Sequence, residues 1–253
     1  MNTFPRPAFR QRRPLLVIIA PHPDDDILGC GLLIDAARRA GWRLLVVALT
    51  DGQASHPNSA RWPAAALGRL RRGEMRRGLA RLGAGRVPLR FMGWRDGALA
   101  VDGSALRLRQ LLHAVGATNV VAASPVDHHP DHRAAWQLAR IATSARWCRL
   151  HAYEVWARSE TPQRPHFAAG KAAKRWAMAA HRSQVTGYIA DDPEGFVFAA
   201  PILRRLIESG ETLRLGRTKV VRSRNTDPRS RSSRAACREP HPDRRAPALR
   251  RSP

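Results

Sequence analysis

The chain alternates between short apolar runs and longer stretches whose apolar residues recur at helical spacing. Continuous apolar runs are typical of strands buried on both faces. They predict strands at residues 14–20, 43–50 and 119–123, and shorter runs predict strands at 89–92, before a turn at 93–97, and at 150–155. The helical spacing predicts helices at residues 27–40, 64–82, 105–115, 132–145 and 168–180, with one more inside 193–208.

Alternation of strand and helix determines the expected architecture. Strands joined through helices lie parallel, with right-handed crossovers and helices on both faces of the sheet. We therefore expect an α/β domain with a mostly parallel sheet over residues 14–216. A loose leader rich in Pro and Arg precedes it at residues 1–13. A basic tail rich in Arg, Ser and Pro follows at residues 217–253, with too few apolar residues to order itself.

The net charge of +24 suggests a nucleic-acid partner, but its distribution weakens that interpretation. From Arg217 onward there are 12 Lys or Arg and 3 Asp or Glu, so this segment alone carries 12 − 3 = +9. The remaining charge is spread along helical stretches, as on solvated surfaces. Three cysteines without a CxxC pair suit a reducing compartment, and no apolar run approaches the roughly 18 residues of a membrane span. We expect a cytoplasmic protein without a membrane span.

Two clusters of His and Asp follow predicted strands. The first is residues 22–26, His-Pro-Asp-Asp-Asp, and the second is residues 128–132, His-His-Pro-Asp-His. Since active sites of parallel α/β sheets lie at the carboxyl ends of the strands, the two clusters are expected to build one site.

The residue types favour a catalytic zinc site. Two imidazoles and one carboxylate, from His22, Asp25 and His132, form a three-ligand set that leaves room for water and substrate. Asp24 stands beside this set as a candidate base, and His129 as a donor to an oxyanion. Asp131 is a candidate partner that fixes the tautomer of a histidine. For Asp26, a place in the first turn of a helix is the preferred interpretation.

These residues resemble the PIG-L family, also called LmbE-like, of zinc-dependent N-acetylglucosamine deacetylases. The family motif HPDDE reads HPDDD at residues 22–26, with Asp26 in place of Glu, and HPDH stands unchanged at residues 129–132. The resemblance continues at residues 50–52, at Arg72 and Glu74, at residues 96–97 and at residues 181–184. It implies a Rossmann-like three-layer α/β/α sandwich.

The resemblance also implies roles for individual residues. His22, Asp25 and His132 would bind one zinc ion, and Asp24 would be the general base that activates zinc-bound water. His129 would stabilise the oxyanion, with Asp131 as its partner. Candidate substrate-binding residues are Arg72, Glu74, Asp96, His181 and Gln184. His56 and His128 are expected at the surface.

The expected function is a zinc-dependent hydrolase that removes an N-acetyl or other N-acyl group from a small-molecule amino sugar or glycoconjugate. An amidase of the same scaffold that acts on another amide remains open. A basic nucleic-acid-binding protein is the alternative from a different class, and a folded, metal-free scaffold is a third.

Overall fold

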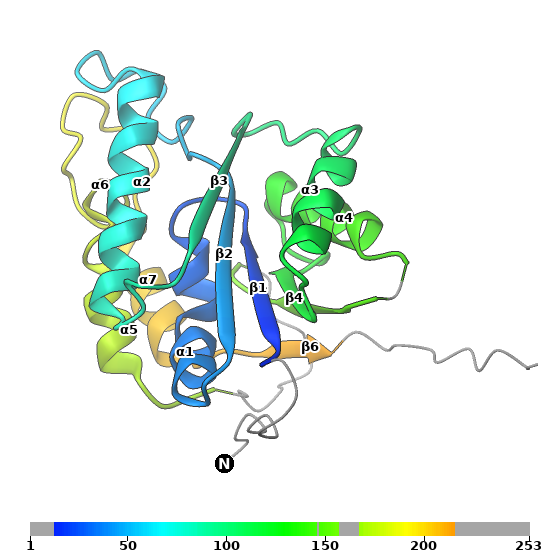
Figure 1. Ribbon diagram of the computed structural model, residues 1–253. Helices are drawn as coiled ribbons and strands as arrows, with labels where there is room; N and C mark the ends of the chain where they lie inside the picture. The colour runs from blue at the N-terminus through cyan, green and yellow to red at the C-terminus, as the bar shows by residue number, and fades with distance from the viewer. Residues whose placement is uncertain (1–12, 146, 157–166, 216–253) are drawn as a thin grey trace, which may run out of the picture. The chain divides into compact units, whose positions relative to one another are not determined.

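The fold is described from a computed structural model, over residues 13–145, 147–156 and 167–215 (Figure 1). The predicted leader, apart from Arg13, and the predicted tail lie outside these residues. The strands are β1 (Leu15–Ala20), β2 (Arg43–Thr50), β3 (Leu89–Trp94), β4 (Asn119–Ala123), β5 (Arg149–Tyr153) and β6 (Leu213–Leu215). The helices are α1 (Asp25–Arg39), α2 (Ala64–Arg81), α3 (Ser104–Ala114), α4 (Pro130–Ala142), α5 (Lys171–Met178), α6 (Arg182–Val185) and α7 (Ala200–Glu208).

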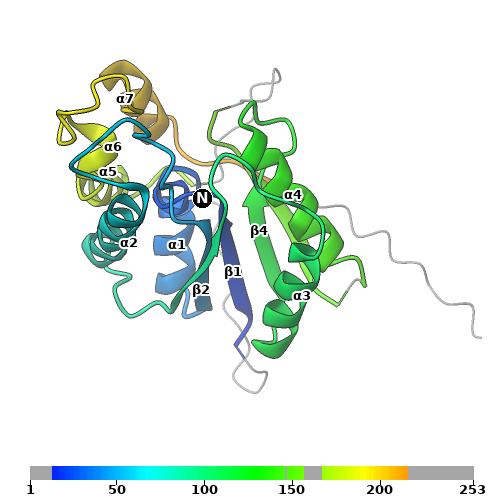
Figure 2. The same ribbon diagram turned by 90° about the horizontal axis from the view of Figure 1, so that it is seen from above.

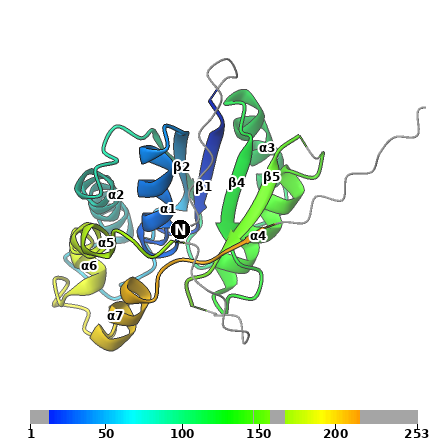
Figure 3. The same ribbon diagram turned by 90° about the horizontal axis from the view of Figure 1, so that it is seen from below.

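The described strands form one sheet of six, in the order β3-β2-β1-β4-β5-β6. The first five are parallel, and β6 runs antiparallel beside β5. Figures 2 and 3 show α1, α2, α5, α6 and α7 on one face and α3 and α4 on the other. The expected three-layer α/β/α sandwich with a mostly parallel sheet is therefore confirmed.

The pleat of β1 shows why its apolar residues do not alternate with polar ones. Leu16 and Ile18 pack into the core under α1 and α2, while Val17 and Ile19 pack into the core under α3 and α4. All four side chains are at most 2% exposed. Both faces of the central strand are buried, so each position stabilises the domain by removing apolar surface from water.

The segment after α4 is tied to α1 through a buried ion pair. The Nζ of Lys174 lies 2.7 Å from Oε1 of Glu211 and donates to the carbonyl of Leu28 at 2.6 Å. The carboxylate of Glu211 accepts from the backbone N–H groups of Leu32 and Leu33, at 2.8 and 2.9 Å. Charged groups at this depth need such partners, so the pair fixes the C-terminal segment against the middle of α1.

Two further features bear on the expectations. Within the described residues, no helix is both long enough and apolar enough to cross a membrane. Cys30 and Cys148 are buried free thiols.

Candidate active site

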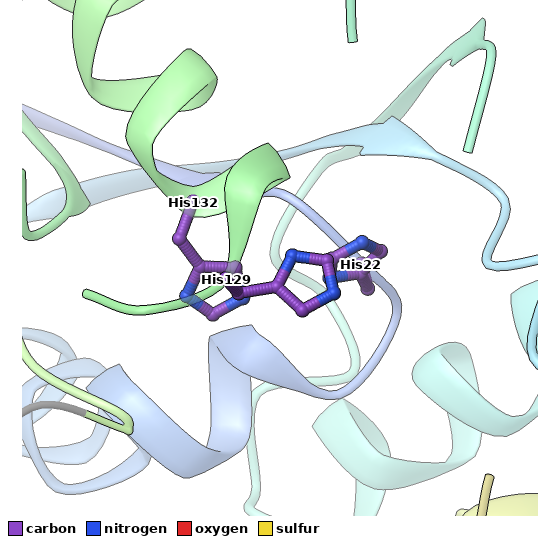
Figure 4. A group of neighbouring side chains, drawn as sticks. All are labelled: His22, His129 and His132. Carbon is purple, nitrogen blue, oxygen red and sulfur yellow. The ribbon is translucent and has the colours of Figure 1, made fainter. Parts of the chain in front are cut away.

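The strand order places the two His/Asp clusters side by side. From β1 the chain passes outward through β2 to β3, whereas β4 lies on the other side of β1 and continues to β5. Crossovers on the two sides leave in opposite directions, so a crevice opens at the carboxyl ends of β1 and β4. The turn after β1 carries His22, and the start of α4 carries His129 and His132. Figure 4 shows the three imidazoles gathered there.

The three imidazole rings lie in contact. The ring of His22 is 4.7 Å from that of His129 and 5.5 Å from that of His132, centroid to centroid. The rings of His129 and His132 are 5.0 Å apart. Residues more than a hundred positions apart in the sequence are thus within reach of one small ligand.

Ring nitrogens of His22 and His132 converge on Asp25. Its Oδ2 lies 3.1 Å from Nδ1 of His22 and 3.2 Å from Nε2 of His132, and it accepts from the backbone N–H of His22 at 3.0 Å. Nε2 of His132 is buried, and its contact with Asp25 does not have the geometry of a hydrogen bond. A buried nitrogen without a well-formed hydrogen bond is a candidate metal ligand, since buried polar groups are otherwise hydrogen-bonded.

Carboxylates hold the opposite ring nitrogens. Nε2 of His22 lies 3.2 Å from Oδ1 of Asp96 and 3.2 Å from Oδ2 of Asp131. Nδ1 of His132 lies 3.0 Å from Oδ2 of Asp127. A carboxylate on one nitrogen of an imidazole fixes the proton there and leaves the other nitrogen free to bind a metal. The donors at His22, Asp25 and His132 therefore fit a zinc ion, and the carboxylates behind them supply the support such sites need.

The electrostatics of the site favour positive charge. Burial lowers the pKa of His132, but Asp25 and Asp127 outweigh it and raise this pKa to about 9. Burial likewise opposes the charge on His22, yet contacts with Asp131, Asp25 and Asp96 raise its pKa well above the usual value. The same carboxylates would stabilise a bound divalent cation.

Asp24 has an environment that differs from that of Asp25. It is 4% exposed, and its Oδ2 accepts from Nη2 of Arg71 at 2.9 Å. Burial raises the pKa of Asp24 to about 6, although Arg71 acts in the opposite direction. A carboxylate with such a pKa is ionised at neutral pH and still basic enough to take a proton.

His129 caps α4, and the cap fixes its tautomer. Nδ1 of His129 accepts from the backbone N–H of Asp131 at 3.2 Å. Nδ1 is thus the acceptor, which puts the proton of the neutral ring on Nε2. Burial lowers the pKa of His129, and the nearby His22 and His132 act in the same direction. His129 is therefore a neutral donor through Nε2.

The resemblance implied that Asp131 pairs with His129, and in the structure its carboxylate lies elsewhere. Oδ2 contacts Nε2 of His22 and accepts from the N–H of Gly97 at 2.8 Å, while Oδ1 accepts from Leu99 at 3.1 Å. Asp131 is the first-turn residue of α4, and its side chain extends from there toward β1 and the loop after β3. It orients His22.

A pocket of about 240 Å³ opens over these groups. Seven of the residues singled out in the sequence line it: His22, Asp24, Asp25, Asp96, His129, His132 and Gln184. Asp131 lies directly behind His22.

Three candidate substrate-binding residues lie elsewhere. Arg72 pairs with Asp51 and stacks over Phe91. Glu74 is 1% exposed and holds Ser183 through its N–H and hydroxyl, at 2.9 and 2.6 Å. His181 is fully buried. Glu74 and His181 belong to the packing of α2 against α6, behind the pocket.

Arg71 and Asp127 are the charged residues near the candidate ligands that the sequence analysis missed. Arg71 is 3% exposed and reaches the pocket, whereas its neighbour Arg72 faces outward. The signal was present, because residues 67, 71, 74, 75, 78 and 79 recur at helical spacing and form the buried face of α2. Asp127 stands five positions before His132, where the chain leaves β4.

His56 lies in a different environment from the one expected, and Asp26 lies in the expected first turn of a helix but is also buried. His56 is 2% exposed and not at the surface, because the backbone at Gly195 packs directly against its ring. Asp26 is fully buried in the first turn of α1, and neither of its carboxylate oxygens has a partner among the described residues. Burial raises the pKa of Asp26 well above its usual value.

The family comparison covers the segment that carries this site. The sequence pattern of the PIG-L family, described as GlcNAc-PI de-N-acetylase, matches residues 17–143, which is half of the chain and includes both clusters. This chain belongs to the PIG-L family. No curated protein matches it in sequence.

Solved structures similar to this PIG-L chain share its fold. A conserved protein from Thermus thermophilus is 29% identical, with a TM-score of 0.53 over 67% of this chain and 79% of that one. The N,N'-diacetylchitobiose deacetylase of Pyrococcus horikoshii is 21% identical, with a TM-score of 0.62 over 79% and 83%. The 4-carboxy-2-hydroxymuconate hydratase GalB of Pseudomonas putida is 19% identical, with a TM-score of 0.54 over 82% and 98%.

Proposed function

We propose that this protein is a zinc-dependent N-deacetylase that hydrolyses the amide of an N-acylated amino sugar or glycoconjugate. The observation that carries the proposal is the convergence of Nδ1 of His22 and Nε2 of His132 on Oδ2 of Asp25. Membership of the PIG-L family and the fold shared with a chitobiose deacetylase support an N-deacetylase or amidase type of hydrolase. The chemistry that zinc supplies at such a site is Lewis acidity and a pKa of water lowered to about 7.

Asp24 would act first as the general base and then as the general acid of the reaction. Its carboxylate lines the pocket beside Asp25 and is held by Arg71, so it can accept a proton from the attacking water. It then carries that proton to the amine nitrogen as the carbon–nitrogen bond breaks. The fixed contact with Arg71 keeps the carboxylate oriented through both transfers.

His129 would stabilise the charge that develops on the acyl oxygen. Its neutral ring carries the proton on Nε2, because Nδ1 is occupied by the cap of α4. A fixed donor at the position of a developing oxyanion lowers the barrier, because it needs no reorganisation during the reaction. Asp131 and Asp127 keep His22 and His132 in their orientations. The products are a free amine and a carboxylate, acetate in the simplest case.

The alternatives differ in what the pocket would accept. An amidase that acts on another amide would use the same groups. GalB shows that a hydratase also occurs on this fold. A nucleic-acid-binding protein would not use this pocket for phosphates. The lining includes the carboxylates of Asp24, Asp25 and Asp96, which repel phosphate groups.

The test is acetate release from a panel of N-acetylglucosamine conjugates by zinc-loaded protein. Asp24→Asn should retain zinc and lose roughly 10²- to 10⁴-fold in turnover, as expected for a missing general base. Asp102→Asn, the same change at an exposed position before α3, should leave turnover unchanged.

Two results would count against the proposal. Equal turnover of the zinc-loaded Asp24→Asn variant and the wild type would remove Asp24 from the role of base. Absence of acetate release and of any other amide hydrolysis by the zinc-loaded wild type would remove the proposed activity.

A further inference from the structure

One side of the pocket is made of aromatic rings. Trp156 and Phe198 are stacked, with ring centroids 5.3 Å apart and an angle of 12° between the planes. Phe196 meets both edge-on, at 6.0 Å from Trp156 and 4.9 Å from Phe198. All three line the pocket that contains His22 and Asp25. We call these three residues the aromatic wall.

The aromatic wall is held in place by backbone hydrogen bonds. The N–H of Phe196 donates to the carbonyl of Ser55 at 2.7 Å, and the N–H of Phe198 donates to the carbonyl of Gln184 at 2.8 Å. The N–H of Trp156 donates to Oδ2 of Asp127 at 3.2 Å. That oxygen also contacts Nδ1 of His132. The wall and the candidate metal site are therefore positioned by a shared carboxylate.

Neighbouring loop contacts make the wall a fixed surface. A Cβ at Gly195 would lie 2.1 Å from the ring of His56, so the glycine allows the chain before Phe196 to cross this buried histidine. Asp192 accepts from the N–H of Asn58 at 2.9 Å, which joins the same two loops. A surface built in this way is ready for a ligand without paying the entropy of ordering loops.

The chemistry of the wall selects the ligand. Neither phenylalanine has a polar atom on its ring, and Phe196 remains 41% exposed. Exposed apolar surface inside a pocket marks a binding site, because covering it removes that surface from water. An acetyl group alone offers one methyl, whereas this wall has three rings. The groups that would act on the amide line the same pocket.

We propose that the substrate carries an apolar group that packs on the aromatic wall, so that the wall determines substrate preference. This inference rests on the proposed deacetylase function. The apolar group is either an acyl chain longer than acetyl or a hydrophobic aglycone attached to the sugar. Both sources present the same chemistry to the wall, and a two-armed experiment distinguishes them.

The experiment compares three zinc-loaded proteins on three substrates. The reference is methyl N-acetylglucosaminide, the acyl arm is its N-octanoyl analogue, and the aglycone arm is octyl N-acetylglucosaminide. The proteins are the wild type, Phe196→Ala and the control Val197→Ala, whose side chain is 38% exposed beside the wall and outside the pocket lining. Amine release gives kcat/KM, and calorimetry gives Kd for each compound.

The wild type should prefer one octyl-bearing substrate over the reference by about tenfold or more, as a hydrophobic pocket does for added methylenes. Phe196→Ala should abolish most of that preference, because its kcat/KM should fall more for the octyl-bearing substrate than for the reference. Val197→Ala should keep the preference. Preference in the acyl arm identifies a longer acyl chain, and preference in the aglycone arm identifies the aglycone.

Three results would overturn the inference: no preference in either arm, an equal loss on all substrates in Phe196→Ala, or the same loss in Val197→Ala. Calorimetry separates this failure from failure of the proposed function. Tighter binding of an octyl compound, lost in Phe196→Ala, without hydrolysis of any substrate would refute the deacetylase and retain the apolar site. If the reference is hydrolysed but neither octyl compound binds more tightly or turns over faster, the deacetylase function stands and the apolar site is refuted.

Discussion

The two sides of the pocket originate in different ways. The proposed metal-binding side comes from the segments that directly follow the neighbouring strands β1 and β4: His22 from the turn after β1, and Asp25 and His132 from the first turns of α1 and α4. The aromatic wall comes from the chain after β5, and its position depends on contacts with Ser55, Gln184 and Asp127. The sheet itself positions side chains that directly follow its strands. A surface that selects the substrate is placed by loops, and loops vary more readily than the scaffold that carries them.

The largest expected effect is at the metal-binding side. His132→Ala removes one of three proposed ligands, so zinc content should fall from about one per chain to near zero and hydrolysis to the background rate. Elemental analysis after dialysis measures the first, and acetate release the second. His128→Ala, an exposed histidine four positions earlier, should change neither. Full zinc content in His132→Ala would contradict the ligand set.

The anchor of the C-terminal segment should have the largest effect on stability. Glu211→Gln leaves the buried ammonium of Lys174 without its counter-charge, and the free energy of unfolding should fall by about 3–5 kcal/mol. Chemical denaturation measures the change. Glu208→Gln breaks the exposed pair with Arg175 and should cost about 0–1 kcal/mol. Equal effects of the two substitutions would show that the anchor does not stabilise the segment that carries the wall.

Asp127 joins the two sides, so its substitution should affect both. Asp127→Asn weakens the support of Nδ1 of His132 and should reduce zinc affinity by about 10- to 100-fold. A competition titration with a zinc chelator measures this affinity. The contact with the N–H of Trp156 should weaken as well, and a second measurement is needed to detect that change. Near-ultraviolet circular dichroism reports on the tryptophan. An unchanged zinc affinity in Asp127→Asn would show that Asp127 does not support the metal site. Asp102→Asn is again the matched control.

The last effect is the smallest near neutral pH and grows only on acidification, and it concerns His181 behind the pocket. Burial lowers the pKa of His181 from 6.5 to about 3, and Arg71 acts in the same direction. The unfolded state therefore binds a proton that the folded state does not, and stability falls as the pH drops from 6.5 toward 3. The wild type should lose up to about 1.4 kcal/mol per pH unit more than His181→Asn in this range. If the free energies of unfolding of the wild type and His181→Asn fall equally with decreasing pH, His181 is not held neutral in the folded protein.

The fold was largely predictable because its signals are local. The bounds of β2 and β4 agree with the sequence expectation, since each is a continuous apolar run between polar residues. β3 continues through Gly93 to Trp94, where the sequence indicated a turn, because the glycine adopts a positive φ of 65° within the strand. The three residues of β6 were missed, because so short a segment has no measurable periodicity.

The site was predictable only where its residues stand next to strand ends. The pairing of Asp131 with His22 depends on how α4 approaches β1, and the sequence contains no sign of that approach. The choice between Arg71 and Arg72 was available from helical spacing, since Arg71 shares the buried face with Leu67 and Met75. The aromatic wall required the tertiary structure, because its three rings come from two separate segments.

The most direct test of the central claim is the position of zinc in a crystal of the protein, located by anomalous scattering. Two other sets of side chains are close enough to compete with the proposed ligands for an ion, one of His22, His129 and His132 and the other of His22, Asp96 and Asp131. We predict one peak at about 2.0–2.1 Å from Nδ1 of His22 and Nε2 of His132, with Asp25 as the third ligand. A peak on Nε2 of His22 between Asp96 and Asp131, or no peak at the strand ends, would contradict the account.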